Sequence, residues 1–133
     1  MRTKLLSLAV CLTLLFSPQI VSAQQSDIPS TITTAFSNGD ANKLADFISA
    51  NIELTVNNKN DIYSKKQAVG IISDFFKTNK VLSFKILHTS NVNAVSFAIG
   101  ELKTDKGNFR ITINLKSAGG NTEILKLIIE RSE

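Results

Sequence analysis

Cysteine and histidine are almost missing from this chain, whose 133 residues include one of each, Cys11 and His88. A single cysteine cannot close an intramolecular disulfide, so a disulfide-stapled scaffold is excluded. Zinc sites draw on several cysteine or histidine ligands, and the tract NNKND, residues 57–61, has too few acids for a calcium loop. The sequence also has no glycine-rich phosphate loop. It therefore predicts neither a metal site nor a cofactor.

The first 23 residues, MRTKLLSLAVCLTLLFSPQIVSA, have the pattern of a secretory signal peptide. Arg2 and Lys4 supply the positive start, and Val21-Ser22-Ala23 forms a small-residue cleavage site. The apolar run 5–16 is shorter than the roughly 20 residues that a membrane anchor, the alternative interpretation, would need. Cys11 follows Val10, where a lipoprotein would have a small residue. We expect a periplasmic or extracellular protein with no membrane span once the signal is removed.

Residues 24–133 have the length of one domain with one hydrophobic core. The formal net charge of the full chain is +4, and Arg2 and Lys4 of the signal contribute two of these charges. The remaining basic residues are scattered among acids, whereas a nucleic-acid-binding domain gathers them into a basic stripe. The sequence thus predicts a single domain that does not bind nucleic acid.

Two short helices are predicted at the start of this domain. Asp27 and Pro29 are typical of a helix start, and Asn38-Gly39 of a helix end. Asp40 then caps a second helix that extends to Ile48. Their apolar faces are formed by Ile28, Ile32, Ala35 and Phe36 and by Ala41, Leu44, Ala45, Phe47 and Ile48. Helices this short need a sheet to pack against.

A short hairpin and a long helix follow. The alternation in IELTV, residues 52–56, predicts a half-buried strand, the polar tract 57–61 a turn, and Ile62-Tyr63 the start of a returning strand. Ser64 and Gln67 form a capping box for the helix. Its apolar stripe consists of Ala68, Ile71, Ile72, Phe75 and Phe76. Gly70 costs about 1 kcal/mol against alanine inside a helix, so we expect it to pack closely against another element.

Four strands complete the chain, at residues 81–88, 94–102, 108–116 and 123–130, with short turns that make neighbours antiparallel. We expect one face of these strands to point toward the helices, and Phe97, at its centre, to be among the least replaceable residues. The inward set is Leu82, Phe84, Ile86, Val95, Phe97, Ile99, Phe109, Ile111, Ile113 and Leu115. Phe97→Ala should then cost about 3–5 kcal/mol.

This order of elements resembles the nuclear transport factor 2-like, or cystatin-like, cone fold, an α+β architecture. Within it, DIPSTITTAFSNGD, DIYSKKQA, FAIGEL, FRITINL and LIIE are similar to a family of small secreted bacterial proteins, domain of unknown function 4783. The resemblance implies a long helix lying across a curved sheet and enclosing a cavity. That family has no established activity to carry over. The wider superfamily includes ketosteroid isomerases and dehydratases as well as noncatalytic binding domains.

The candidate acid and base groups are Tyr63, His88 and Glu101, all at the ends of elements. His88 is the side chain with an ordinary pKa near neutrality, but a lone histidine at a strand end is more often a solvated residue. Tyr63 could donate a hydrogen bond into the cavity, or simply bury its ring. Because the other inward positions are apolar, the sequence favours binding over catalysis. An enzyme of the isomerase or dehydratase type remains the alternative.

A ligand of the cavity is expected to be a small apolar molecule, held by Phe75, Phe76, Phe84 and Phe97. Its affinity should hardly change with salt, since no desolvated charge pair is available. A protein partner is the other possibility. The small residues Ala94, Ser96, Ala98 and Gly100 and the apolar strand 123–130 predict an outer sheet face on which a second copy could pack to form a homodimer. Covering of this face by the chain's own terminus is equally compatible with the pattern.

The signal peptide gives the first testable expectation. Mass spectrometry of the exported protein should show a chain that begins at Gln24, because cleavage is predicted between Ala23 and Gln24. Retention of Cys11 with an attached lipid would contradict this prediction.

Overall fold

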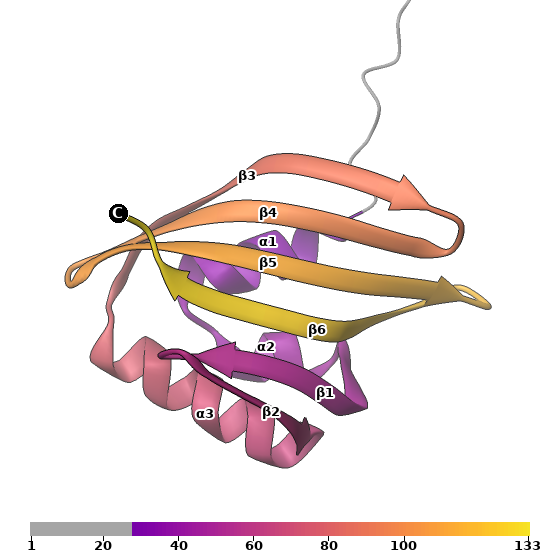
Figure 1. Ribbon diagram of the computed structural model, residues 1–133, viewed down its shortest axis with the longest axis horizontal. Coiled ribbons are helices and arrows are strands. Elements are labelled where there is room, and N and C mark those ends of the chain that lie inside the picture. Colours follow the sequence, from indigo (N-terminus) through magenta and orange to yellow (C-terminus); the bar gives the residue numbers. More distant parts are fainter. Residues whose placement is uncertain (1–27) are drawn as a thin grey trace, which may run out of the picture.

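Three helices and six strands make up residues 28–133, the part of the chain described by this computed structural model (Figure 1). In chain order they are α1 (Ser30–Asn38), α2 (Ala41–Ala45), β1 (Ile48–Val56), β2 (Lys59–Ser64), α3 (Lys65–Thr78), β3 (Val81–Val92), β4 (Val95–Thr104), β5 (Gly107–Ala118) and β6 (Asn121–Arg131). The predicted α+β class is confirmed. The predicted signal peptide and the Asp27 cap lie outside the described residues.

The ends of the first two helices follow from local chemistry. α1 begins directly after Pro29 and ends at Gly39, whose φ of 61° is the left-handed conformation that glycine adopts without strain. Asp40 caps α2 by accepting a hydrogen bond from the Lys43 amide at 3.1 Å. α2 is shorter than predicted, because Ile48 belongs to β1 and pairs with Ile124 of β6. Pairing with a distant strand has overridden the local helical pattern.

The hairpin turn is tighter than the polar tract suggested. Only Asn57 and Asn58 form it, with φ of 53° and 63°, the two positive values of a type I′ turn. β2 therefore begins at Lys59, within the tract expected to be a turn. The predicted capping box is confirmed: the Ser64 hydroxyl accepts from the Gln67 amide at 3.3 Å, and the Gln67 side chain accepts from the Ser64 amide at 3.2 Å.

All six strands form one sheet in the order β2-β1-β6-β5-β4-β3 (Figure 1). The expected four-stranded antiparallel meander is present as β3 to β6, but it is extended by the hairpin, because β1 pairs with β6 in parallel. The sheet is consequently mixed. The helices lie behind it in Figure 1, so that view looks onto the face they leave uncovered.

The core lies between the helices and the inner face of the sheet. β5 is oriented as predicted, and its inner residues Phe109, Ile111, Ile113 and Leu115 are buried. β6 adds Ile124, Leu127 and Ile129. A bulge in β6 follows Ile124, since Leu115 pairs with Ile124 and Asn114 pairs with Lys126. Leu125 and Ile128 are half-buried, so this strand is apolar on both faces, as its sequence indicated.

The prediction for β4 is wrong, because its two faces are exchanged. Every second residue of β4 is buried on the inner face, and most of these residues are small: Ser96, Ala98, Gly100, Leu102 and Thr104. Val95, Phe97 and Ile99 are half-exposed on the outer face. Phe97 is therefore not a core residue. The cost expected for Phe97→Ala assumed a core position and does not apply.

The reason is an aromatic ring from the neighbouring strand. Phe84 of β3 packs directly over Gly100, where an added Cβ would lie 2.5 Å from the ring. The same ring lies 4.8 Å from that of Phe36 in α1, which in turn meets Phe76 of α3 edge-on at 6.2 Å. Small residues on β4 thus leave room for a large residue from β3. The alternation of large and small side chains along β4, taken alone, therefore predicts the wrong inner face for this strand.

β3 also departs from a simple alternation. Its register with β4 shifts twice, between Val81 and Ser83 and between Ile86 and His88. Leu82 and Leu87, at these irregularities, are 64% and 55% exposed, so the predicted inward position of Leu82 is wrong. The second shift turns His88 to the outer face, where it pairs with Ile99.

Gly70 does not make the close contact that was expected of it. It is exposed in the middle of α3, and a Cβ added there would have no neighbour within 4 Å. Its conformational cost is not offset by packing in this structure.

The two glycines give opposite stability predictions. Gly100→Ala should lower the free energy of unfolding by about 1–3 kcal/mol, because the new methyl overpacks against Phe84. Gly70→Ala should raise it by about 0.5–1 kcal/mol, because alanine loses less backbone entropy in a helix. Urea unfolding of both variants checks this, and two changes of the same sign would contradict the packing described.

Candidate functional site

A hollow opens at one end of the sheet, where the end of α3, the β1–β2 turn, the β4–β5 turn and the C-terminus come together on the left of Figure 1. We call it the mouth hollow. Its volume is about 430 Å³. It is lined by Val56, Asn57, Ile71, Asp74, Phe75, Thr78, Asn79, Lys106, Phe109 and Arg131.

The apolar wall of the mouth hollow is built by α3, β5 and the end of β1. The rings of Phe75 and Phe109 meet edge-on, with centroids 4.9 Å apart, and Val56 and Ile71 continue the wall. Two smaller hollows share residues with it. One, of about 340 Å³, includes Tyr63 and also Val56 and Ile71. The mouth hollow therefore continues along α3 toward the β1–β2 hairpin.

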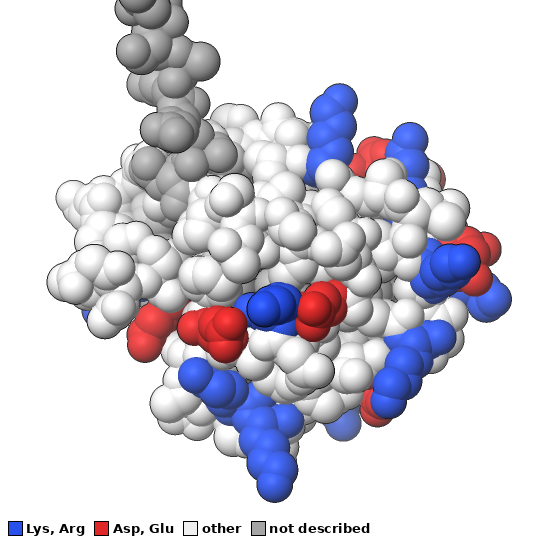
Figure 2. Space-filling model, turned by 180° about the vertical axis from the view of Figure 1, so that it is seen from behind, with Lys and Arg blue, Asp and Glu red and all other residues white. Residues whose placement is uncertain are grey.

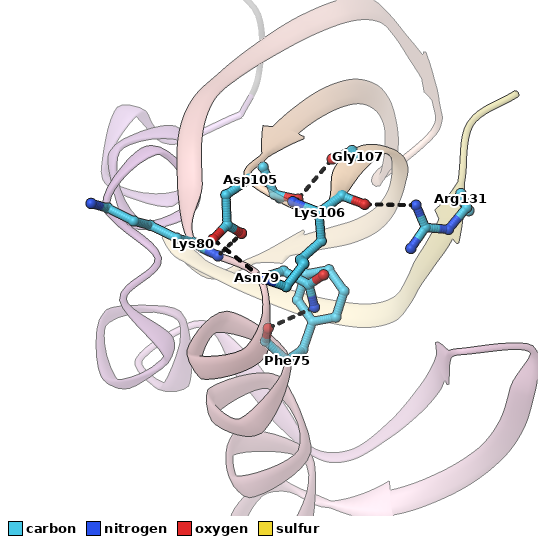
Figure 3. Close-up of polar contacts among 8 residues, drawn as sticks. Phe75, Asn79, Lys80, Asp105, Lys106, Gly107 and Arg131 are labelled. Carbon is cyan, nitrogen blue, oxygen red and sulfur yellow. Dashed lines mark hydrogen bonds and ion pairs between the residues drawn. The ribbon is translucent and has the colours of Figure 1, made fainter.

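Polar groups form the rim. On the α3 side, Asn79 is buried and donates its side-chain amide to the Phe75 carbonyl at 3.0 Å, which closes the end of the helix. On the opposite side lie Lys106 of the β4–β5 turn and Arg131 of β6, and Figure 3 shows the Arg131 guanidinium directed at the Lys106 carbonyl. Asp74 adds an exposed acid on the α3 side.

The β4–β5 turn is fixed by several hydrogen bonds (Figure 3). Asp105 exchanges two with Lys80: its carboxylate accepts from the Lys80 amide at 2.9 Å, and its own amide donates to the Lys80 carbonyl at 3.0 Å. The Thr104 hydroxyl donates to the Gly107 carbonyl at 2.7 Å. This side of the rim is therefore tied to the beginning of β3.

The four phenylalanines predicted to bind a ligand are not brought together. Phe75 lines the mouth hollow. Phe76 and Phe84 are buried in the core with Phe36 and do not line it. Phe97 lies on the outer face of the sheet. Only Phe75 is thus placed to contact a molecule in the mouth hollow, and its role in binding stays a prediction.

The three acid and base candidates are also separated. Tyr63 lines the smaller hollow beside Ile71. His88 is exposed on the outer face, and Glu101 lies on that face too, 3.7 Å from the Lys103 ammonium. The sheet stands between Tyr63 and the other two. Groups that act together on one substrate must lie within hydrogen-bond reach of it, which these three do not.

Of the residues that line the mouth hollow, sequence reasoning named only Phe75 as a ligand-binding residue and missed the others, among them Asn79, Lys106, Phe109 and Arg131. Phe109 was recognised as inward-facing but not as part of a cavity wall. Lys106 and Arg131 lie 25 positions apart and meet only because β5 and β6 pair. No local pattern in the sequence marks either one, so only a knowledge of the strand pairing could have found them.

Charges of both signs are interspersed elsewhere on the surface, and Figure 2 shows no continuous basic stripe on the helical face. On the outer face, Glu53 accepts hydrogen bonds from Lys126 at 3.0 Å and from Asn60 at 3.2 Å. The Lys126 hydrogen bond, followed by that of Asn60, holds the pKa of Glu53 below its ordinary value of 4.5. Within residues 28–133 no group of three or more His, Cys, Asp or Glu side chains could hold a metal ion.

The cone of helices on a curved sheet, with its hollow at one end, defines the class: this is a nuclear transport factor 2-like fold. An NTF2-like protein from Cytophaga hutchinsonii has a TM-score of 0.59 at 11% identity, over 77% of this chain and 91% of that one. At that identity the likeness concerns the fold alone. The family Domain of unknown function (DUF4783) matches residues 29–130, and the chain belongs to this family.

Crystal structures of two DUF4783 family proteins agree with this assignment. The protein from Bacteroides ovatus has 28% sequence identity and a TM-score of 0.77, covering 82% of this chain and 99% of that one. The protein from Bacteroides fragilis has 29% identity and a TM-score of 0.76, covering 80% and 100%. No curated protein matches the chain. None of the helices in the described residues is long and apolar enough to cross a membrane.

Proposed function

We propose that this protein is an exported, noncatalytic binding module that takes a small, largely apolar molecule into the mouth hollow. The observation that carries the proposal is the wall formed by Phe75, Phe109, Ile71 and Val56 around about 430 Å³ of space. That volume falls within the range of roughly 300–1,000 Å³ in which small-molecule sites occur. The signal-peptide pattern of residues 1–23 supports a periplasmic or extracellular location.

The positions of the candidate catalytic groups favour binding over turnover. Tyr63 lines the smaller hollow without His88 or Glu101, which lie across the sheet. An isomerase- or dehydratase-like reaction needs an acid or base aimed at the substrate from a dry interior. Turnover of a cyclic ketone that disappeared in Tyr63→Phe while the fold was retained would favour the enzymatic alternative.

A second copy of the chain on the outer sheet face is the second candidate for a partner. The outer face of β4 carries the half-exposed Val95, Phe97 and Ile99, and Val92 beside them on β3 is 60% exposed. An apolar stripe of this kind marks many interaction surfaces. The charged residues of this face have both signs, since Lys85, Glu101, Arg110 and Glu130 follow one another across the strands. A copy would therefore meet no repulsive field of a single sign.

The ligand proposal is tested with N-phenyl-1-naphthylamine, a neutral apolar dye whose fluorescence rises when it leaves water. Ile71→Trp should weaken its binding roughly tenfold or more, because the larger ring occupies the hollow and removes apolar area that the dye would bury. Leu87→Trp, on the exposed bulge of β3, is the matched control and should bind as wild type. Dye binding that is unchanged in Ile71→Trp would contradict the proposal. Dye binding that is weakened by both variants would contradict it as well. The affinity for this neutral dye should hardly change with salt.

The dimer is tested by sedimentation velocity. The wild-type chain should sediment as a dimer, and Phe97→Glu as a folded monomer, because a charge is placed in the apolar stripe and not in the core. Ser83→Glu, near the start of β3, should remain dimeric. A wild-type monomer at high micromolar concentration would exclude this interface.

A further inference from the structure

Arg131, the last residue of β6, presents a fixed guanidinium at the rim of the mouth hollow. Its Cζ lies 4.9 Å from the centre of the Phe109 ring, over the ring face. One of its amino groups, Nη1, donates to the Lys106 carbonyl at 2.9 Å (Figure 3). An arginine stacked on an aromatic ring and hydrogen-bonded at one end keeps little rotational freedom. The cation is therefore positioned before any ligand arrives.

The β4–β5 turn is shaped to receive this guanidinium. Gly107 has a φ of 121°, and a Cβ at this position would lie 2.5 Å from Nη1 of Arg131. Any other residue here would thus displace the arginine or the turn. The turn itself is tied to Lys80 by the two hydrogen bonds of Asp105. The glycine and the braced turn together make the cation part of the cavity wall.

The guanidinium has binding capacity left over. Arginine offers five N–H donors, and the Lys106 carbonyl uses one of its amino groups. Within residues 28–133 no carboxylate forms an ion pair with Arg131, whereas Lys126 is paired with Glu53 and Lys106 with Asp105. Arg131 lines the mouth hollow together with Phe75 and Phe109, so a ligand in the hollow can meet both the cation and the apolar wall.

We propose that the ligand of the mouth hollow is a small amphiphilic carboxylate whose apolar body lies against Phe75 and Ile71 and whose carboxylate binds Arg131. This inference rests on the proposed binding function and adds the chemistry of the head group. The planar fork of a guanidinium matches the two oxygens of a carboxylate. Asp74, on the α3 side of the rim, disfavours an anion there, so the head group is directed to the Arg131 side.

The test compares octanoate with octanol, which share the apolar chain and differ in the charged head group. Isothermal titration calorimetry of the full mature chain at pH 7 should show octanoate binding about tenfold more tightly than octanol, the preference expected of one partly exposed charged hydrogen-bonded pair. Raising the salt concentration should weaken octanoate binding and leave octanol binding unchanged. For a carboxylate ligand, this salt dependence replaces the salt-insensitive affinity expected from the sequence, which placed no charged group at the cavity. Octanol tests the proposed binding function alone, because it has the apolar chain but no carboxylate for Arg131.

Arg131→Gln should abolish the preference for octanoate while octanol still binds. Arg110→Gln, the same substitution on the outer face of β5, is the matched control and should keep the preference. Arg131→Lys retains the charge but not the fork, and should keep part of the preference. If Arg131 served only to hold the end of β6, its variants would change both affinities equally, and the ratio of octanoate to octanol would not move.

The outcomes separate the two proposals. Equal affinities for octanoate and octanol in the wild type, or a preference that survives in Arg131→Gln, would overturn the role of Arg131 and leave the binding function standing. Absence of binding by both compounds would overturn the binding function and this inference together. Should Arg131→Gln fail to fold, Arg131→Lys and the salt dependence of the wild type still decide the question.

Discussion

The packing of Phe84 over Gly100 is the contact on which the arrangement of this protein depends. It brings a strand-borne aromatic ring into the cluster formed by Phe36 of α1 and Phe76 of α3. Only glycine leaves room for the ring at this point of β4, since a Cβ would lie 2.5 Å from it. One contact thus joins the two main helices to the inner face of the sheet, in a core where close packing tolerates little change in volume.

The same contact decides what each face of the sheet offers. Because the inner face of β4 is small, its larger residues, including Phe97, are displaced to the outer face, where they form the apolar stripe. The mouth hollow adjoins this aromatic cluster, because Phe75, which lines the hollow, meets Phe76 edge-on at 5.8 Å, where α3 ends and the β4–β5 turn holds Arg131. The closed aromatic core and the open hollow therefore divide the cone between a part that stabilises the fold and a part available to a ligand.

The candidate site was predictable only in part. Phe75 and Tyr63 were identified because they follow the helical stripe and the strand-to-helix junction, both of which are local patterns. His88 was expected at the cavity rim, but a one-residue bulge near Leu87 reverses the side of the sheet on which it lies. Arg131 and Lys106 were not identified, because their proximity arises from the pairing of β5 with β6 and from the space that Gly107 leaves beside the guanidinium.

The sequence by itself determined the order of the elements, the capping box at Ser64, the glycine end of α1 and the inward face of β5, since each depends on residues within a few positions of one another. The tertiary structure decided the parallel pairing of β1 with β6, the inward face of β4 and the position of Arg131 beside the hollow. These features depend on contacts between distant segments. A strand whose alternate residues are all apolar or small can face either way, and its orientation is set by the ring that the neighbouring strand places against it.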